Sequence, residues 1–207
     1  MDISAYLDAL ASDAATPGGG SAAALVGATG AALVAMVARI TLASPKHAEV
    51  HAAAASLIED ADAVRSALLA DREADEEAYG AVVSVMALPR TTPEEKAART
   101  ERMQAALAHA AAVPLQTAHR GREVLTLARR ALDLKNDHLV SDVGCAAEFA
   151  AAAIRACAYN VRINHKFLKD QALIAAQSSD LQALEQHAAT QLEHIRSGIR
   201  LGGSIAR

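Results

Sequence analysis

Two acidic or amide-rich stretches of the chain could handle a proton or a polar ligand. The first reads DREADEEAYG, and within it Asp75 and Tyr79 lie four residues apart, on one side of a predicted helix, next to Val82 and Met86. A carboxylate that points inward from such a position can be tuned for proton transfer. Asp75 is therefore a candidate acid or base, and the alternative is an ordinary solvated helix face.

The second stretch contains four polar side chains around a predicted alanine-rich helix. Asn136 and Asp142 lie in KNDHLVSDVG, ahead of the helix, and Asn160 and Asn164 share one face near its end. An amide left unpaired in an apolar helix costs about 1–3 kcal/mol. These two asparagines must therefore pair with each other, with a backbone group or with a ligand, such as a planar heterocycle.

A run of three glycines, in TPGGGSAAA, precedes the longest uncharged segment. Gly18, Gly19 and Gly20 let the backbone approach a ligand closely, and Ser21 lies where the free amides of a helix start point outward. Such a start favours carboxylates or developing negative charge. A phosphate-binding P-loop is excluded, because no Lys follows the last glycine and a helix precedes the loop. The alternative is a simple turn between helices, which needs only one glycine.

Metal and disulfide chemistry are not indicated. The chain has no HExxH, CxxC or Glu-x-x-His pattern, and His47 and His51 form an isolated pair. Cys145 and Cys157 lie on one predicted helix, roughly 18 Å apart, which is beyond disulfide reach. We expect no metal, and two free cysteines in a reducing cytosol.

The composition bounds the class of protein. The 207 residues suffice for one domain, residues 1–207, and apolar residues make up 52 % although aromatics make up only 2 %. Alanine therefore supplies most of the core, which suits closely packed helices. A net charge of -4 argues against nucleic-acid binding. The acidic start MDISAYLDAL does not resemble a signal peptide, so we expect a cytoplasmic protein.

The positioning elements are predicted to be about seven helices in a single all-α bundle, without strands. Thr92, Pro93 and Glu95 form a capping box that starts one helix, and Pro114 is expected to kink or restart it. Ser179 and Gln182 suggest a second capping box in a final helix pair. The predicted helices cover about residues 3–10, 21–42, 46–88, 93–112, 114–134 and 141–165, followed by that pair.

The uncharged segment 14–38 is long enough to cross a membrane. It is mostly alanine and glycine, however, and lacks an aromatic belt and basic flanks. We therefore expect the buried central helix of a bundle and no membrane partner.

Five motifs together resemble the formiminotransferase-cyclodeaminase and methenyltetrahydrofolate cyclohydrolase family. They are TPGGGSAAALVGATGAALVAMVARITL, D-x-x-A-Y at 75–79, VPL at 113–115, N-x-x-x-x-S-D-x-G-x-A-A at 136–147 and NVRIN at 160–164. The resemblance implies an all-helical homodimer that acts on tetrahydrofolate carrying a one-carbon unit, with no further cofactor. Because no formiminotransferase domain is attached, we expect opening of methenyl- to formyl-tetrahydrofolate. The alternatives are ring closure of formimidoyl-tetrahydrofolate with release of ammonia, and a non-catalytic folate-binding or scaffold protein.

The resemblance also suggests a role for each matching residue. Asp75 and Asp142 are candidates for proton transfer and for facing the methenyl cation. The substrate-binding residues would be Gly18, Gly19, Gly20 and Ser21 at the helix start, Asn136, Asn160 and Asn164 at the pterin, and Arg39 and Lys46 at the glutamate tail. One departure concerns that tail: where the family often has GKKKY, this chain has ASPKH and keeps only Lys46.

Overall fold

The computed structural model describes residues 2–199, and in that range it contains helices and no β-strand. The α-helices are α1 (Ile3–Leu10), α2 (Gly19–Ala43), α3 (His51–Met86), α4 (Pro93–Leu132), α5 (Val140–His165) and α6 (Gln171–Gly198), with short 3-10 helices η1 (Pro45–Val50) and η2 (Asp137–Leu139). The all-α prediction is confirmed. Six α-helices replace the predicted seven or so, because two expected breaks are absent.

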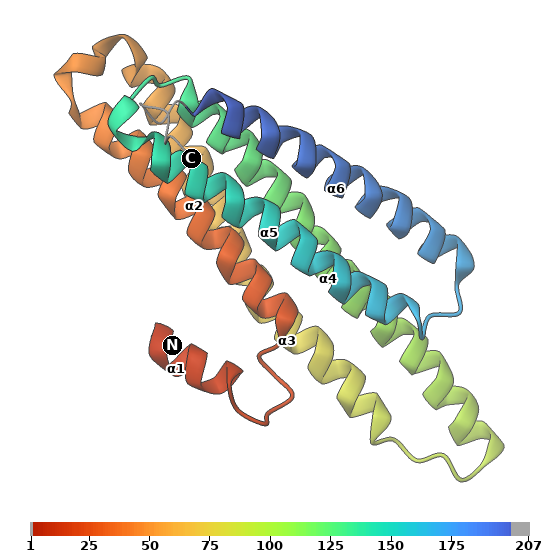
Figure 1. The fold of residues 1–207 in the computed structure, drawn as a ribbon. Helices are drawn as coiled ribbons and strands as arrows, with labels where there is room; N and C mark the ends of the chain where they lie inside the picture. The colour runs from red at the N-terminus through yellow and green to blue at the C-terminus, as the bar shows by residue number, and fades with distance from the viewer. Residues whose placement is uncertain (1, 200–207) are drawn as a thin grey trace, which may run out of the picture.

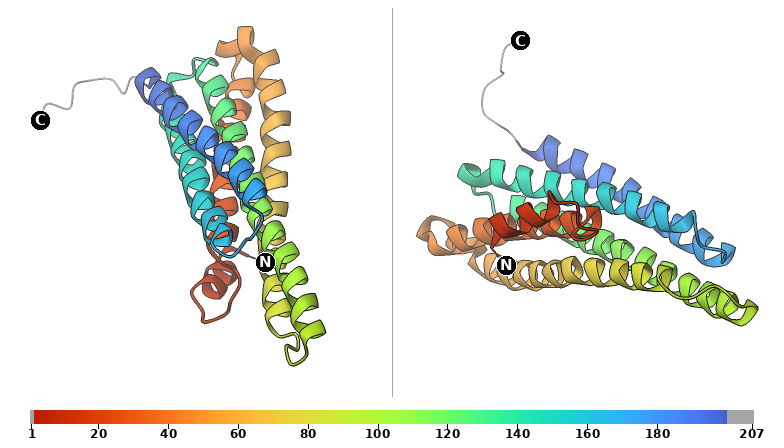
Figure 2. Two further views of the ribbon diagram at one scale, coloured as in Figure 1. Left: turned by 90° about the vertical axis from the view of Figure 1, so that its right-hand side faces the viewer. Right: turned by 90° about the horizontal axis from the view of Figure 1, so that it is seen from below.

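Helices α2, α3, α4 and α5 form an antiparallel ring in which each contacts the next, and α6 packs outside against α4 and α5 (Figure 1). The short α1 lies beside the start of α2 (Figures 1 and 2). Because the direction alternates, one end of the bundle collects the starts of α2 and α4 and the ends of α3 and α5. We call this the glycine end and the opposite one the distal end. The α3–α4 hairpin projects beyond the other helices at the glycine end (Figure 2).

Helix α2 is the predicted buried central helix, and small residues allow its close packing. A methyl group added at Gly27 would lie 3.3 Å from the Leu68 side chain, and one at Gly30 would lie 2.9 Å from the Ala146 carbonyl oxygen. In the described range α2 is long and apolar enough to cross a membrane, but 61 % of its most apolar 18-residue stretch is buried in the bundle. Such burial is typical of a core helix in a helical bundle.

Helix α4 continues through Pro114 as one element, so the predicted restart of the helix there is wrong, while a kink stays a prediction. Proline has no N–H, so the carbonyl of Ala110, four residues earlier, loses its usual helix partner. The side-chain amide of Asn164 on α5 donates to that carbonyl at 3.0 Å. A distant side chain thus replaces the missing backbone hydrogen bond.

The predicted start at Ser179 is also wrong, because α6 already begins at Gln171. Its N-cap is Asp170, whose carboxylate accepts from the amide of Leu173 at 3.0 Å. The capping box at Thr92 is confirmed: its hydroxyl accepts from the Glu95 amide, and the Glu95 carboxylate accepts from the Thr92 amide.

Candidate active site

A pocket of about 350 Å³ lies at the glycine end, where the projecting α3–α4 hairpin meets the start of α2 and the end of α5. Its volume is within the range of about 300–1,000 Å³ usual for small-molecule sites. Four segments line it: Ala15, Thr16, Gly18 and Gly19 before and in α2; Asp75, Ala78, Tyr79, Val82 and Met86 of α3; Leu107 and Ala110 of α4; and Asn160, Ile163, Asn164 and Phe167 of α5 and its end.

The glycine corner holds the Asp75 carboxylate against the first turn of α2. The amide of Ser21 donates to Asp75 Oδ2 at 2.8 Å, so a side chain from α3 caps a helix whose own N-cap, Gly18, has no side chain. A methyl group added at Gly20 would lie only 2.1 Å from Asp75 Oδ1. Gly20 is therefore required for this approach, and the partial positive charge of the helix start faces the carboxylate.

The environment of Asp75 raises its pKa above the value usual for aspartate. Burial is the largest cause, the hydrogen bond from the Ser21 amide opposes it, and the nearby charge of Glu76 raises the pKa further. A carboxyl group whose pKa is moved towards neutrality is better suited to exchange a proton near neutral pH. The geometry therefore equips Asp75 for acid–base chemistry.

The two amides of α5 face the same pocket and pair with backbone groups, as one sequence-based alternative predicted. Asn160 Nδ2 donates to the Ala156 carbonyl at 3.0 Å, and Asn164 Nδ2 donates to the carbonyls of Ala110 and Asn160. Neither side-chain oxygen accepts a hydrogen bond from the described residues. A methyl group added at Gly19 would lie 3.6 Å from the Asn160 amide group, so the glycine corner and the amide helix meet.

The apolar walls of the pocket include residues that sequence reasoning missed. Ile163 and Phe167 of α5 and its end are 47 % and 62 % exposed, and Leu107 comes from the facing side of α4. The sequence contained a signal for Ile163, which stands three residues after Asn160 and so lies on the same helix face. Phe167 lies two residues beyond the end of α5, so helix periodicity gave no signal for it. Together with Tyr79 they provide flat or apolar surface around the polar groups.

Four further candidates lie at the distal end and do not reach this pocket within one chain. Arg39 is 20 residues beyond Gly19 on α2, and Asp142 is 18 residues before Asn160 on α5, which amounts to roughly 30 Å and 27 Å. Arg39 pairs with Asp62, Lys46 is exposed on η1, and the Asn136 amide donates to the Thr41 hydroxyl at 3.0 Å. Helix length thus excludes a shared site inside one protomer.

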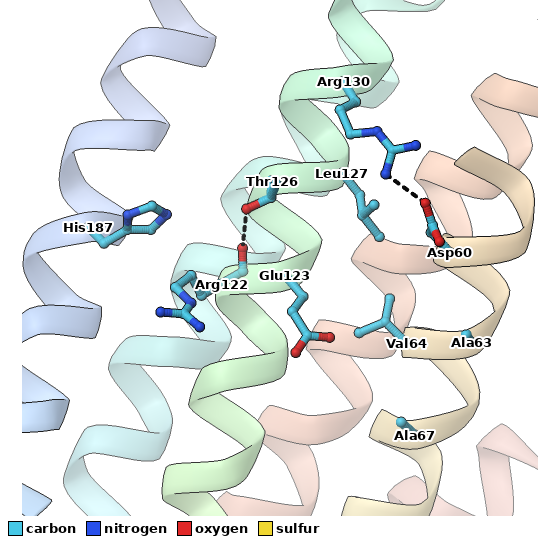
Figure 3. Close-up of a pocket in the computed structure, with 10 residues that line it drawn as sticks. All are labelled: Asp60, Ala63, Val64, Ala67, Arg122, Glu123, Thr126, Leu127, Arg130 and His187. Carbon is cyan, nitrogen blue, oxygen red and sulfur yellow. Dashed lines mark hydrogen bonds and ion pairs between the residues drawn. The ribbon is translucent and has the colours of Figure 1, made fainter. Parts of the chain in front are cut away.

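A larger groove of about 760 Å³ runs between α3, α4 and α6 (Figure 3). It contains none of the candidate residues. Its Arg130 already pairs with Asp60 at 2.7 Å, while burial and the charge of Arg122 lower the pKa of His187. The smaller pocket, with a carboxylate, two amides and a helix start, is therefore the better candidate site.

Neither metal binding nor thiol chemistry stands out among the described residues. No three His, Cys, Asp or Glu side chains gather there in a way that could hold a metal ion. Cys157 lies buried behind Asp75, and burial with the charges of Asp75 and Asp71 strongly raises the pKa of its thiol. This cysteine is thus an apolar packing residue.

Comparison with known proteins gives four consistent matches. A family model described as Formiminotransferase-cyclodeaminase matches residues 2–183. The chain is 40 % identical over 198 residues to methenyltetrahydrofolate cyclohydrolase of Methylorubrum extorquens, covering 96 % of this chain and 95 % of that protein. It is 31 % identical to formimidoyltransferase-cyclodeaminase of Rattus norvegicus, covering 91 % of this chain but 35 % of that protein. A crystal structure of formiminotetrahydrofolate cyclodeaminase from Thermotoga maritima shares the fold, with a TM-score of 0.86, 24 % identity and coverage of 97 % and 96 %.

Proposed function

The chain belongs to the formiminotransferase-cyclodeaminase family, and we propose that it is a methenyltetrahydrofolate cyclohydrolase. The observation that carries this is the 40 % identity to the Methylorubrum extorquens enzyme along nearly the full length of both chains. The match to the rat protein is weaker, and there the chain corresponds to about a third of a longer protein.

The pocket suits the chemistry of opening a methenyl bridge. The bridge is a cationic amidine, and a carboxylate beside it offsets the positive charge. Water attacks the bridge carbon, its proton passes to Asp75, and a tetrahedral carbon bound to two nitrogens results. The same carboxyl group then returns the proton to one nitrogen as the carbon–nitrogen bond breaks. The new hydroxyl group releases its own proton to solvent at this step, so the products are a formyl group and one free proton. The raised pKa of Asp75 supports this two-way transfer.

The other pocket groups would hold the folate. The free side-chain oxygens of Asn160 and Asn164 can accept from the N–H groups of a reduced pterin, and Tyr79 and Phe167 offer flat surface to its ring. A planar ring with several N–H donors thus matches both the polar and the flat groups of the pocket.

The competing reaction is ring closure of formimidoyl-tetrahydrofolate with loss of ammonia. It passes through a similar tetrahedral carbon, so the same pocket could serve it. Purified protein should remove the near-ultraviolet absorbance of methenyl-tetrahydrofolate and release little ammonia from the formimidoyl compound. The reverse preference would make the chain a cyclodeaminase, and folate binding without either activity would make it a binding protein.

An Asp75→Asn variant should lower methenyl-tetrahydrofolate turnover about 100-fold or more, because an amide cannot carry the proton. Asp13→Asn, in the exposed segment before the glycines, is the matched control and should behave like wild type. Equal rates in the Asp75 variant and the wild type would remove Asp75 from the mechanism.

We further propose that the enzyme is a homodimer formed by the exposed face of α2 and α5 (Figure 1). On α2 this face contains Val26 and Ile40, both exposed, and on α5 it contains Phe149. No charged residue interrupts α2 between Gly19 and Ala38. Exposed apolar residues on two neighbouring helices are typical of an interaction site.

The exposed stripe on α2 can pair with the same stripe of a second copy across a two-fold axis. Outward residues from Ala22 to Ile40 centre on Ala31. In an antiparallel pairing about that point, Gly19 lies opposite the partner's Ala43. Each pocket would then adjoin the distal end of the other subunit, where the remaining candidates lie.

Mixing two variants tests this shared site. Asp75→Asn and Asp142→Asn should each be nearly inactive alone. After dissociation and reassociation, half of the dimers are mixed and each restores one of two sites, so about a quarter of wild-type activity returns. Failure to regain activity would contradict the shared site. Val26→Glu should give monomers by light scattering, whereas Leu69→Glu, equally exposed on α3, should leave the dimer intact.

A further inference from the structure

Ser21 contacts two consecutive carboxylates of α3 at once. Its amide donates to Asp75 at 2.8 Å, and its hydroxyl donates to Glu76 Oε1 at 2.9 Å. The side chain is fully buried, so these bonds compete little with water. The first turn of α2 is thereby fastened to α3 at the position of the candidate catalytic carboxylate.

Two further groups complete this arrangement from outside the pocket. The Tyr6 hydroxyl of α1 lies 3.0 Å from the Ser21 hydroxyl and can donate to it, while the latter donates to Glu76. Arg72, one turn before Glu76, donates to the same Glu76 oxygen at 3.3 Å, and its guanidinium lies over the Tyr6 ring, 5.5 Å from the centroid. Tyr6 is the one buried residue of α1, so this contact is what docks that helix.

We propose that Glu76 is a positioning residue for Asp75: with Tyr6 and Arg72 it fixes Ser21, and its charge sets the electrostatic environment in which Asp75 exchanges its proton. The proposal rests on the proposed function for its catalytic meaning. Its geometric part, one serine held between two carboxylates, does not depend on which folate reaction occurs. Glu76 itself does not line the pocket, so it acts through Ser21 and Asp75.

Among the titratable groups around Asp75, Glu76 is the one whose charge shifts the pKa of Asp75. Arg72 of α3 bonds to Glu76. Helix α3 itself also carries Asp71, which is paired with Arg120 of α4 at 2.9 Å, and Tyr79 at the pocket. Helix α5 contributes the buried Cys157, whose thiol is neutral, and α2 contributes only backbone amides near Asp75. Neutralising Glu76 should therefore act on Asp75 directly.

The test is Glu76→Gln, with Glu77→Gln as a matched control. Glu77 is the next residue, is exposed, and makes no hydrogen bond or ion pair with the described residues. Glutamine can still accept from Ser21 but carries no charge, so the pKa of Asp75 should fall. Carbon-13 NMR titration of the aspartate carboxyls in the ligand-free full-length chain, with Asp75 assigned through Asp75→Asn, measures this without any activity. The pH limb of turnover governed by Asp75 should move to lower pH in parallel.

The outcomes separate the two proposals. An unchanged Asp75 titration in Glu76→Gln, or an equal change in Glu77→Gln, overturns the role of Glu76 whatever the activity. A lowered Asp75 pKa in Glu76→Gln supports the electrostatic role, and if the wild-type chain turns over no folate, only the proposed function is contradicted.

The contact with α1 has its own variant. Tyr6→Phe keeps the ring under Arg72 but removes the hydroxyl from Ser21, and should lower kcat by up to about tenfold, in line with the loss of one buried hydrogen bond. Tyr159→Phe, whose residue is 74 % exposed on α5, is the control and should match wild type. Ser21→Ala should match or exceed the Tyr6→Phe effect, and adding Tyr6→Phe to it should cost nothing more. Additive losses would show that α1 acts by another route.

Discussion

The close approach of Gly20 to Asp75 gives the sharpest prediction, through the substitution Gly20→Ala. The new methyl group would lie 2.1 Å from Asp75 Oδ1 and 2.5 Å from its Cγ, more than 1 Å inside normal contact. The backbone of two packed helices cannot yield easily, so the carboxylate must rotate away. It then loses the hydrogen bond from the Ser21 amide, and that bond is worth about 1.5–3 kcal/mol because the acceptor is charged.

The change also brings a gain that must be subtracted. Alanine is better than glycine inside a helix by about 0.5–1 kcal/mol. The free energy of unfolding should therefore fall by about 1–2 kcal/mol, which lowers Tm by roughly 2–8 °C in a chain of this size. Turnover should fall by about 100-fold, since a displacement of about 1 Å at a catalytic group has that effect.

Two comparisons isolate the cause. At Gly80 on α3 an added methyl group meets no atom within 4 Å, so Gly80→Ala should raise the free energy of unfolding by about 0.5–1 kcal/mol. In an Asp75→Ala background the obstacle is gone, so Gly20→Ala should become neutral or stabilising. Urea denaturation of the four variants measures this coupling. The same cost for Gly20→Ala with and without Asp75 would refute the steric reasoning.

Three further predictions concern buried polar groups. Asn164→Ala should lower the free energy of unfolding by about 1–3 kcal/mol, because the Ala110 carbonyl then has no hydrogen-bond donor. The loss should shrink when Pro114→Ala restores the helix N–H to that carbonyl. Urea denaturation of both single variants and of the double variant tests this. In the native protein, a thiol reagent should modify the exposed Cys145 and spare the buried Cys157, with both reacting after denaturation. Because burial raises the pKa of Asp75 in the folded state, its stabilising contribution is complete below the unfolded value of 3.8 and is lost as the pH rises through the folded pKa. Asp75→Asn should therefore become more stable relative to wild type as the pH rises above about 4, and denaturation at several pH values would show no trend if this sign were wrong.

The parts of the fold predicted from sequence were those encoded by neighbouring residues. The capping box at Thr92 needs only residues within one turn, and it is present. The continuation of α4 through Pro114 was not predicted, because the group that replaces the missing hydrogen bond, Asn164, lies 50 residues later in the chain. The residues around Ser179 fit the capping-box pattern, but they lie inside α6, whose N-cap is Asp170. A local pattern cannot show whether a distant group has replaced a missing hydrogen bond.

The candidate site follows the same division. The spacing of Asp75 and Tyr79 placed both on one face of α3, and both line the pocket. The contact between Gly20 and Asp75 joins segments about 55 residues apart, so no local rule could reveal it. By contrast, the separation of Asp142 from Asn160 could have been counted along one helix from the sequence alone. That count predicts that one subunit cannot bring both to the same ligand.

The alanine-filled interior has a consequence for how a folate enters and leaves. Where α2 crosses α3 and α5 there are few long side chains that could swing aside, and at Gly30 even a methyl group would crowd the neighbouring backbone. The crossing of these helices therefore cannot widen through rotamer changes, so the cavity must open through its own wall and rim residues. At the rim lie the turn before Gly18 and the solvent-exposed ring of Phe167. A folate would enter and leave the pocket past these two groups.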